Sequence, residues 1–161
     1  SLNSGKCKVL SLGKGAGSFG YEINNGSLRV KLEGSCLERD LGVQVDSELT
    51  FEEHIWSKVK TANKIVGLIR RNFGEAGAHS LMTIYKAMVR PHLEYAQVVW
   101  SPYKVKLVDA LEKVQKRATK LIPGFGKFGY EERFRRLNLP TLLPSLERGY
   151  DHDLQNYEWT L

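Results

Sequence analysis

The sequence predicts an α+β fold, with a small antiparallel β-sheet and hairpins at the N-terminal end followed by a bundle of about four or five helices. Two observations support this prediction. Up to residue 46, short β-favouring segments are separated by Gly, Asn and Ser, whereas beyond it apolar residues recur at alternating steps of three and four. This change of period divides the chain into residues 1–47 and 48–161.

Four short strands are expected in the first part, over residues 8–12, 21–23, 28–32 and 41–45. The last strand alternates between apolar and polar residues except at Gly42, and a strand tolerates glycine where another backbone comes close. Four strands suffice for an antiparallel sheet.

The first predicted helix has an apolar stripe that must be buried. The stripe consists of Phe51, Ile55, Val59, Ala62, Val66, Ile69 and Phe73, and Gly74 is expected to end the helix. A second helix is predicted over residues 78–89, with Leu81, Ile84, Tyr85 and Met88 pointing inward. Pro91 should break or kink it, because proline lacks the amide donor and clashes with the preceding turn.

Later segments also have the helical period. Residues 92–100 should add another turn or two of helix. A third helix is predicted over residues 105–122, ended by Pro123 and Gly124, and its buried seam is Leu107, Leu111, Val114, Ala118 and Leu121. A short helix over residues 130–137 and a weakly patterned helical tail from Leu146 complete the prediction.

Basic residues are concentrated in the second part of the chain. The formal net charge is +6 and the sequence pI is ≈ 9.3. Residues 1–50 carry 6 basic and 6 acidic side chains, residues 51–150 carry 18 and 9, and the last eleven residues carry 3 acids and neither Lys nor Arg. This positive charge would attract a polyanion, and a phosphate backbone is the most obvious one.

Composition argues against several other classes of protein. Apolar residues at 42% and charged residues at 26% are globular values. No apolar run approaches the roughly 20 residues that a bilayer span needs, so no membrane is expected as a partner. Cys7 and Cys36 are too few for a disulfide framework and form no zinc spacing with the four histidines, which fits an intracellular location in the nucleus or cytoplasm.

Two basic stripes are expected on the outer faces of the predicted helices. They consist of Lys60, Lys64, Gly67 and Arg71 in the first helix and of Lys106, Lys113, Lys116, Arg117 and Lys120 in the third. A charge stripe on one helix is usually only a solvated surface, but two such helices with little balancing acid favour contact with phosphates. Gly67 would let a sugar-phosphate backbone approach closely.

Three aromatic residues are candidates for stacking on bases, namely Trp56, Trp100 and Tyr103. For Trp100 we favour a place in the core, because so large an apolar group is usually buried.

Two other motifs have simpler explanations. Gly15, Gly17 and Gly20 match the dinucleotide-binding pattern GxGxxG, but strand and turn residues follow where a helix must open. A flexible hairpin connection is therefore the better interpretation. Residues 151–153 read Asp-His-Asp, but adjacent positions on a helix point apart, so a solvated tail is expected instead of a metal site.

Nine segments carry a more specific pattern. Four of them read ERDLGVQVD at residues 38–46, KTANKIVGLIRR at 60–71, YKAMVRPHLEY at 85–95 and LEKVQKRATKLIPG at 111–124. The others occupy residues 2–13, 54–55, 100–103, 130–133 and 139–142. In this order, over nearly the whole chain, they resemble the C-terminal part of the reverse transcriptase of jockey-like long interspersed elements, a group of non-LTR retrotransposons.

The resemblance implies the end of the palm subdomain over residues 1–47 and the helical thumb over residues 48–161. It places Lys6 at the palm's motif D, whose lysine is thought to protonate the pyrophosphate leaving group. It places Leu41, Gly42 and Val43 at motif E, the primer-grip hairpin. It also implies that the thumb helices hold an RNA template and a DNA primer, and that fingers and palm of the same polyprotein precede the chain.

Polymerases of this class hold two Mg²⁺ ions with paired aspartates. The sequence contains no Asp-Asp pair, and Asp40 and Asp46 lie outside any such motif. We therefore expect no catalysis and no cofactor in this chain alone, with Mg²⁺ expected for the parent RNA-directed DNA polymerase. The alternative function is a relic or domesticated helical module that interacts with other proteins. Residues 24–29 and the tail after Gly149 depart from the family's pattern.

Overall fold

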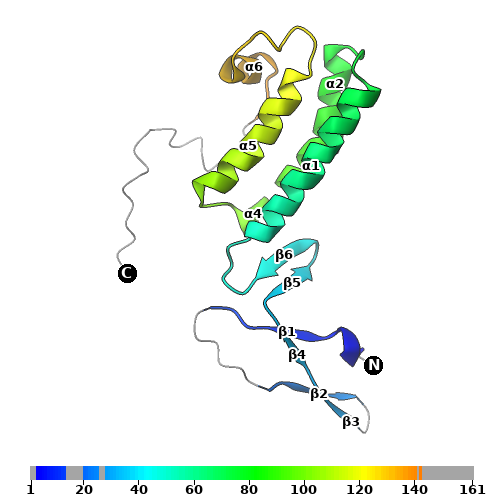
Figure 1. The fold of residues 1–161 in the computed structure, drawn as a ribbon, viewed down its shortest axis with the longest axis vertical. Coiled ribbons are helices and arrows are strands. Elements are labelled where there is room, and N and C mark those ends of the chain that lie inside the picture. Colours follow the sequence, from blue (N-terminus) through cyan, green and yellow to red (C-terminus); the bar gives the residue numbers. More distant parts are fainter. Residues whose placement is uncertain (1–2, 14–19, 26–27, 141, 143–161) are drawn as a thin grey trace, which may run out of the picture.

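The computed structural model places strands at one end of the molecule and helices at the other (Figure 1). It describes residues 3–13, 20–25, 28–140 and 142. The order of the elements confirms the predicted α+β class. Gly15, Gly17, residues 151–153 and the expected helical tail from Leu146 lie outside the described residues.

The N-terminal strands form three separate two-stranded pairs. The pair β1–β4 is parallel, whereas β2–β3 and β5–β6 are antiparallel. A short 3₁₀ helix, η1 (Ser4–Lys6), precedes β1 (Lys8–Leu10), β2 (Glu22–Asn25), β3 (Leu28–Lys31), β4 (Glu33–Ser35), β5 (Leu37–Asp40) and β6 (Val43–Asp46). These pairs take the place of the expected single four-stranded sheet. The strand expected over residues 41–45 is present as β6 but begins at Val43, because Leu41 and Gly42 form the turn between β5 and β6.

The helices follow the predicted order closely. They are α1 (Glu52–Asn72), α2 (Ala78–Ile84), the π-helix η2 (Tyr85–Val89), α3 (Arg90–Glu94), α4 (Gln97–Trp100), α5 (Val105–Lys120) and α6 (Tyr130–Arg136). The stripe of α1 from Ile55 to Ile69 and the seam of α5 pack in one core, which confirms these two periodic patterns. Phe73, expected in the stripe, is instead 44% exposed.

Of the two outcomes expected at Pro91, a break is wrong, since the helical turns continue through it. The turns α2, η2 and α3 follow one another without a gap, and Pro91 lies near the start of α3. The Arg90 amide donates to the carbonyl of Tyr85, five residues earlier, because η2 is a π-helix. A wider turn before a proline relieves the clash between its ring and the preceding carbonyls. Tyr85 is buried as predicted, but Met88 is exposed and does not point inward.

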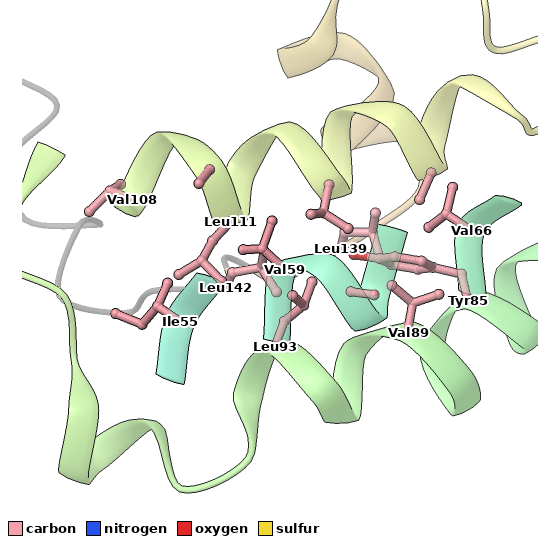
Figure 2. Packing of buried hydrophobic residues seen from close by; sticks show 14 of the residues in the cluster. Ile55, Val59, Val66, Tyr85, Val89, Leu93, Val108, Leu111, Leu139 and Leu142 are labelled. Carbon is pink, nitrogen blue, oxygen red and sulfur yellow. The ribbon is translucent and has the colours of Figure 1, made fainter. Parts of the chain in front are cut away.

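The hydrophobic core lies among α1, α5 and the stretch from α2 to α3. Figure 2 shows side chains of these helices meeting, with Ile55 and Val59 of α1 near Leu111 of α5. Among the described residues before α1, Val43 is the only buried member of this core. The core therefore belongs to the helices, and the strand pairs lie largely outside it.

Asp46 fixes the passage from the last strand to α1. Its carboxylate accepts hydrogen bonds from the backbone N–H groups of Glu48, Thr50 and Phe51 at 3.1, 3.0 and 2.6 Å. Burial alone would raise the pKa of this carboxyl, but these hydrogen bonds outweigh it and lower the pKa. The side chain therefore closes the loop that leads from β6 into α1.

Candidate nucleic-acid interface

Helices α1 and α5 lie side by side and run in the same direction (Figure 1). At their first turns, Glu52 forms ion pairs with Lys104 and Lys106. Further along, Arg117 donates to the side-chain oxygen of Asn63 at 2.7 Å. The pairs Glu52–Lys106 and Asn63–Arg117 both join residues 54 positions apart, since 106 − 52 = 117 − 63 = 54. Equal offsets at two levels mean that the helices are parallel and in register.

This register brings the two predicted basic stripes onto one surface, which we call the basic face. The basic face consists of Lys60, Lys64, Gly67 and Arg71 of α1 and of Lys106, Lys113, Lys116, Arg117 and Lys120 of α5, all exposed. The contact between Asn63 and Arg117 joins the two rows. At 1.5 Å per residue, the face extends over about 17 Å from Lys60 to Arg71 of α1 and about 21 Å from Lys106 to Lys120 of α5.

Charge is distributed unevenly along the basic face. Glu52, Glu53 and the exposed Asp109 lie near the beginning of the two helices, and Glu52 neutralises Lys106. Hydrogen bonds from Lys106 and Lys104 hold the pKa of Glu52 at about 2. Lys106 is thus the member of the predicted set whose charge is satisfied within the chain.

The other half of the basic face carries cations available to a ligand. Within the described residues, these cations form no ion pair: Lys60, Lys64, Arg71, Lys113 and Lys120. Lys116 lies over the ring of Tyr130, with its ammonium nitrogen 4.9 Å from the ring centroid. Exposed, unpaired cations close to one another repel and so do not stabilise the helices, whereas together they would attract a polyanion.

Gly67 lies in the middle of the α1 row of the basic face, and no packing contact requires a glycine there. A Cβ atom built there would meet nothing within 4 Å. Glycine costs about 1 kcal/mol relative to alanine inside a helix. Internal packing does not require the glycine, so its effect is to leave the backbone of α1 bare on the basic face.

The three residues assigned to the primer-grip hairpin occupy different environments. Leu41 and Gly42 form the tip of the β5–β6 hairpin with φ angles of 43° and 85°, and the side chain of Leu41 is 85% exposed. Val43 is buried in the core. We expected another backbone close to Gly42. Instead, a Cβ atom built there would lie 3.4 to 3.9 Å from side-chain atoms of Tyr95.

Lys6 is exposed at the end of η1. Among residues 3–13, 20–25, 28–140 and 142, no group of three or more His, Cys, Asp or Glu side chains could hold a metal ion.

The aromatic candidates separate into exposed and buried residues. Trp56 and Tyr103 are 44% and 69% exposed. Trp100 is 1% exposed and donates its indole N–H to the carbonyl of Tyr95 at 2.7 Å, which confirms its predicted place in the core. Trp100 therefore cannot stack on a base in this structure.

A buried polar network between α5 and its neighbours was missed by the sequence interpretation. The Tyr85 hydroxyl donates to the side-chain oxygen of Gln115 at 2.9 Å, and the Gln115 amide donates to the Tyr130 hydroxyl at 3.1 Å. Tyr130 in turn donates to the carboxylate of Glu112. Burial raises the pKa of both tyrosines, so the hydroxyls stay protonated. The only signal in the sequence is the place of Gln115 between the apolar positions of α5.

His54 is a second buried polar residue that helps to place the hairpin. It is 1% exposed, and its Nδ1 accepts a hydrogen bond from the Gln44 amide of β6 at 3.1 Å. Burial, and next the charge of Lys58, lower its pKa to about 4. A neutral His54 therefore joins β6 to α1.

In comparisons with protein-family models, curated proteins and solved structures, the chain has no match. Within the part of the chain that the structure describes, no helix is both long and apolar enough to cross a membrane.

Proposed function

We propose that this chain is part of a non-LTR retrotransposon reverse transcriptase and that it holds the RNA template and DNA primer without reading their sequence. The observation that carries the proposal is the basic face, on which parallel, in-register helices present two rows of exposed cations. Contacts with phosphates provide affinity without sequence information. The resemblance to the thumb of these polymerases supports the same ligand.

The extent of the basic face suits a duplex. Its unpaired cations, Lys60, Lys64, Arg71, Lys113 and Lys120, occupy several turns of two neighbouring helices. Each phosphate that a cation neutralises should contribute about 0.9 to the slope of log affinity against log salt. Binding through this face should therefore weaken steeply as salt rises.

The strand pairs support a protein partner in addition to nucleic acid. Each described pair has only two strands, and no described residue of β1 to β5 is buried. Two-stranded ribbons are marginally stable in water, and their free edges can pair with further strands. In the proposed function, fingers and palm of the same polyprotein complete these pairs and supply the Mg²⁺-holding aspartates. The motif D role of Lys6 belongs to that assembly.

Filter binding at two salt concentrations tests the proposal with an RNA–DNA primer-template. The triple variant Lys60→Glu, Lys64→Glu and Arg71→Glu should bind much more weakly and with a slope lower by about one unit per lost phosphate contact. The control variant Arg29→Glu, Lys31→Glu and Lys86→Glu makes the same change of charge at exposed positions of β3 and η2.

The control separates the effect of the face from that of net charge. The proposal requires that the control keep most of the affinity of the unmodified chain. Equal losses in both variants would reject the basic face, and absence of salt-sensitive binding by the unmodified chain would favour the protein-interaction module instead.

A further inference from the structure

The tip of the β5–β6 hairpin has an unusual conformation for its sequence. Leu41 and Gly42 both have positive φ, as the two central residues of a type I′ turn do. Glycine adopts this conformation readily, but a leucine rarely does. The turn also leaves 85% of the Leu41 side chain exposed. A residue held in an unfavoured conformation with its apolar side chain in water must be fixed by its surroundings.

One side chain of the helical bundle makes the contacts that fix this tip. The hydroxyl of Tyr95 donates a hydrogen bond to the carbonyl of Leu41 at 2.8 Å. Carbon and oxygen atoms of the same ring lie 3.4 to 3.9 Å from the position of a Gly42 Cβ. The positive φ is the reason why this residue is glycine, and a Cβ there would be in ordinary van der Waals contact with Tyr95.

Tyr95 is itself anchored in the bundle. It follows α3, and its carbonyl accepts the indole N–H of the buried Trp100 at 2.7 Å. The ammonium group of Lys58, on α1, lies 5.7 Å from the centroid of its ring. The bond from Trp100 fixes the backbone of Tyr95, and Lys58 contacts its ring from α1, so Tyr95 can transmit the position of the helices to the hairpin.

We propose that Tyr95 is a positioning residue, which sets the exposed tip of the primer-grip hairpin at a fixed distance and angle from the basic face. His54 ties the same hairpin to α1 through the Gln44 amide at 3.1 Å. The hairpin thus has two attachments, one at its tip and one in β6. The role at the primer rests on the proposed function, whereas the contact between Tyr95 and the tip does not.

The hairpin position can be measured without nucleic acid. Two spin labels, at Leu41→Cys and Asn72→Cys, report the distance from the tip to the end of α1 in a background with Cys7→Ser and Cys36→Ser. Tyr95→Phe keeps the ring and removes only the hydroxyl, so it should broaden the distance distribution by about twofold or more without lowering the melting temperature appreciably. Tyr103→Phe is the matched control, because Tyr103 is 69% exposed and its hydroxyl bonds to no described residue.

A second measurement tests the positioning role on the ligand. A photocrosslinker attached at Leu41→Cys should react with the 3′ end of the primer in an RNA–DNA duplex. Tyr95→Phe should lower the yield at that end by about fivefold, while filter binding of the duplex changes by less than about twofold, because phosphate contacts carry the affinity.

The outcomes are distinguishable. An equally narrow distance distribution in Tyr95→Phe overturns the inference, whether or not the chain binds duplex. A broadened tip with unchanged crosslinking shows a purely structural contact and also overturns it. Failure of the unmodified chain to bind duplex rejects the proposed function, and the distance measurement still decides whether Tyr95 fixes the tip.

Discussion

The helices and the strand pairs of this molecule are stabilised to very different degrees. Side chains such as Ile55, Leu107 and Val114 are fully buried among α1, α5 and their neighbours. In the described part of β1 to β5, by contrast, no residue is buried. The two regions meet at β6, where Val43 enters the core and His54 and Asp46 tie the strand to α1.

This difference has a consequence for function. A charged surface can be presented with defined spacing only where the helices beneath it are fixed by packing. The basic face meets this condition, because α1 and α5 share a core along their length (Figure 2). The pairs β1–β4 and β2–β3 do not meet it, because none of their described residues is buried. The basic face is therefore the surface that this chain can present on its own.

The largest expected effect concerns the core of the helical region. Leu111→Ala should lower the free energy of unfolding by about 2–5 kcal/mol, because Leu111 is 1% exposed and its loss leaves a cavity. Leu28→Ala in β3 should change it by less than about 0.5 kcal/mol, since that side chain is 72% exposed. Urea unfolding measures both, and similar values for the two variants would contradict the comparison.

The buried polar network should come next. Gln115→Leu removes the acceptor of the Tyr85 hydroxyl and the donor to the Tyr130 hydroxyl, which keeps its bond to Glu112. A buried polar group left unsatisfied costs about 1–3 kcal/mol, so the unfolding free energy should fall by up to about 3 kcal/mol. If the same urea experiment finds no loss, the network does not hold α5 against its neighbours.

His54 should make stability depend on pH. Its pKa is about 4 in the folded chain and about 6.5 when unfolded, so the unfolded state binds more protons between these values. Stability should therefore fall as the pH falls, by roughly 2 kcal/mol from pH 7 to pH 5. His54→Gln should lose this component of the pH dependence. An identical pH profile in both proteins would show that His54 titrates normally in the fold.

The smallest effect should follow from removing the first strands. Deleting residues 1–34 takes away β1 to β3 and most of β4 but leaves the core intact. The unfolding free energy of the helical region should stay within about 1 kcal/mol, since exposed ribbons contribute little. A much larger loss would mean that the strand pairs and the helices fold as one unit.

Periodicity predicted the parts of the fold that depend on local patterns. The limits of α1 and α5 lie close to the predicted ones because apolar side chains at helical spacing must face a common core. The π-turn that precedes Pro91 was not predicted, because it cannot be seen in a list of residue types. Met88 was misplaced together with it.

Strand pairing and the assembly of the site could not be predicted from local sequence patterns. Pairing between β1 and β4 joins distant segments, and nothing in their few residues specifies a parallel register. The two basic stripes could be found from spacing, but their union into one face depends on the parallel packing of α1 and α5. The pairing of Lys106 with Glu52 and the contact between Tyr95 and Leu41 are long-range and left no local signal.

Lysine footprinting tests the central claim most directly. The chain is acetylated with and without an RNA–DNA primer-template, and modification at each lysine is compared by mass spectrometry. We predict strong protection of Lys60, Lys64, Lys113 and Lys120 and little at Lys31 and Lys86, which lie in β3 and η2. Protection spread evenly over all these lysines, or its absence from α1 and α5, would contradict a single basic face as the site that holds the duplex.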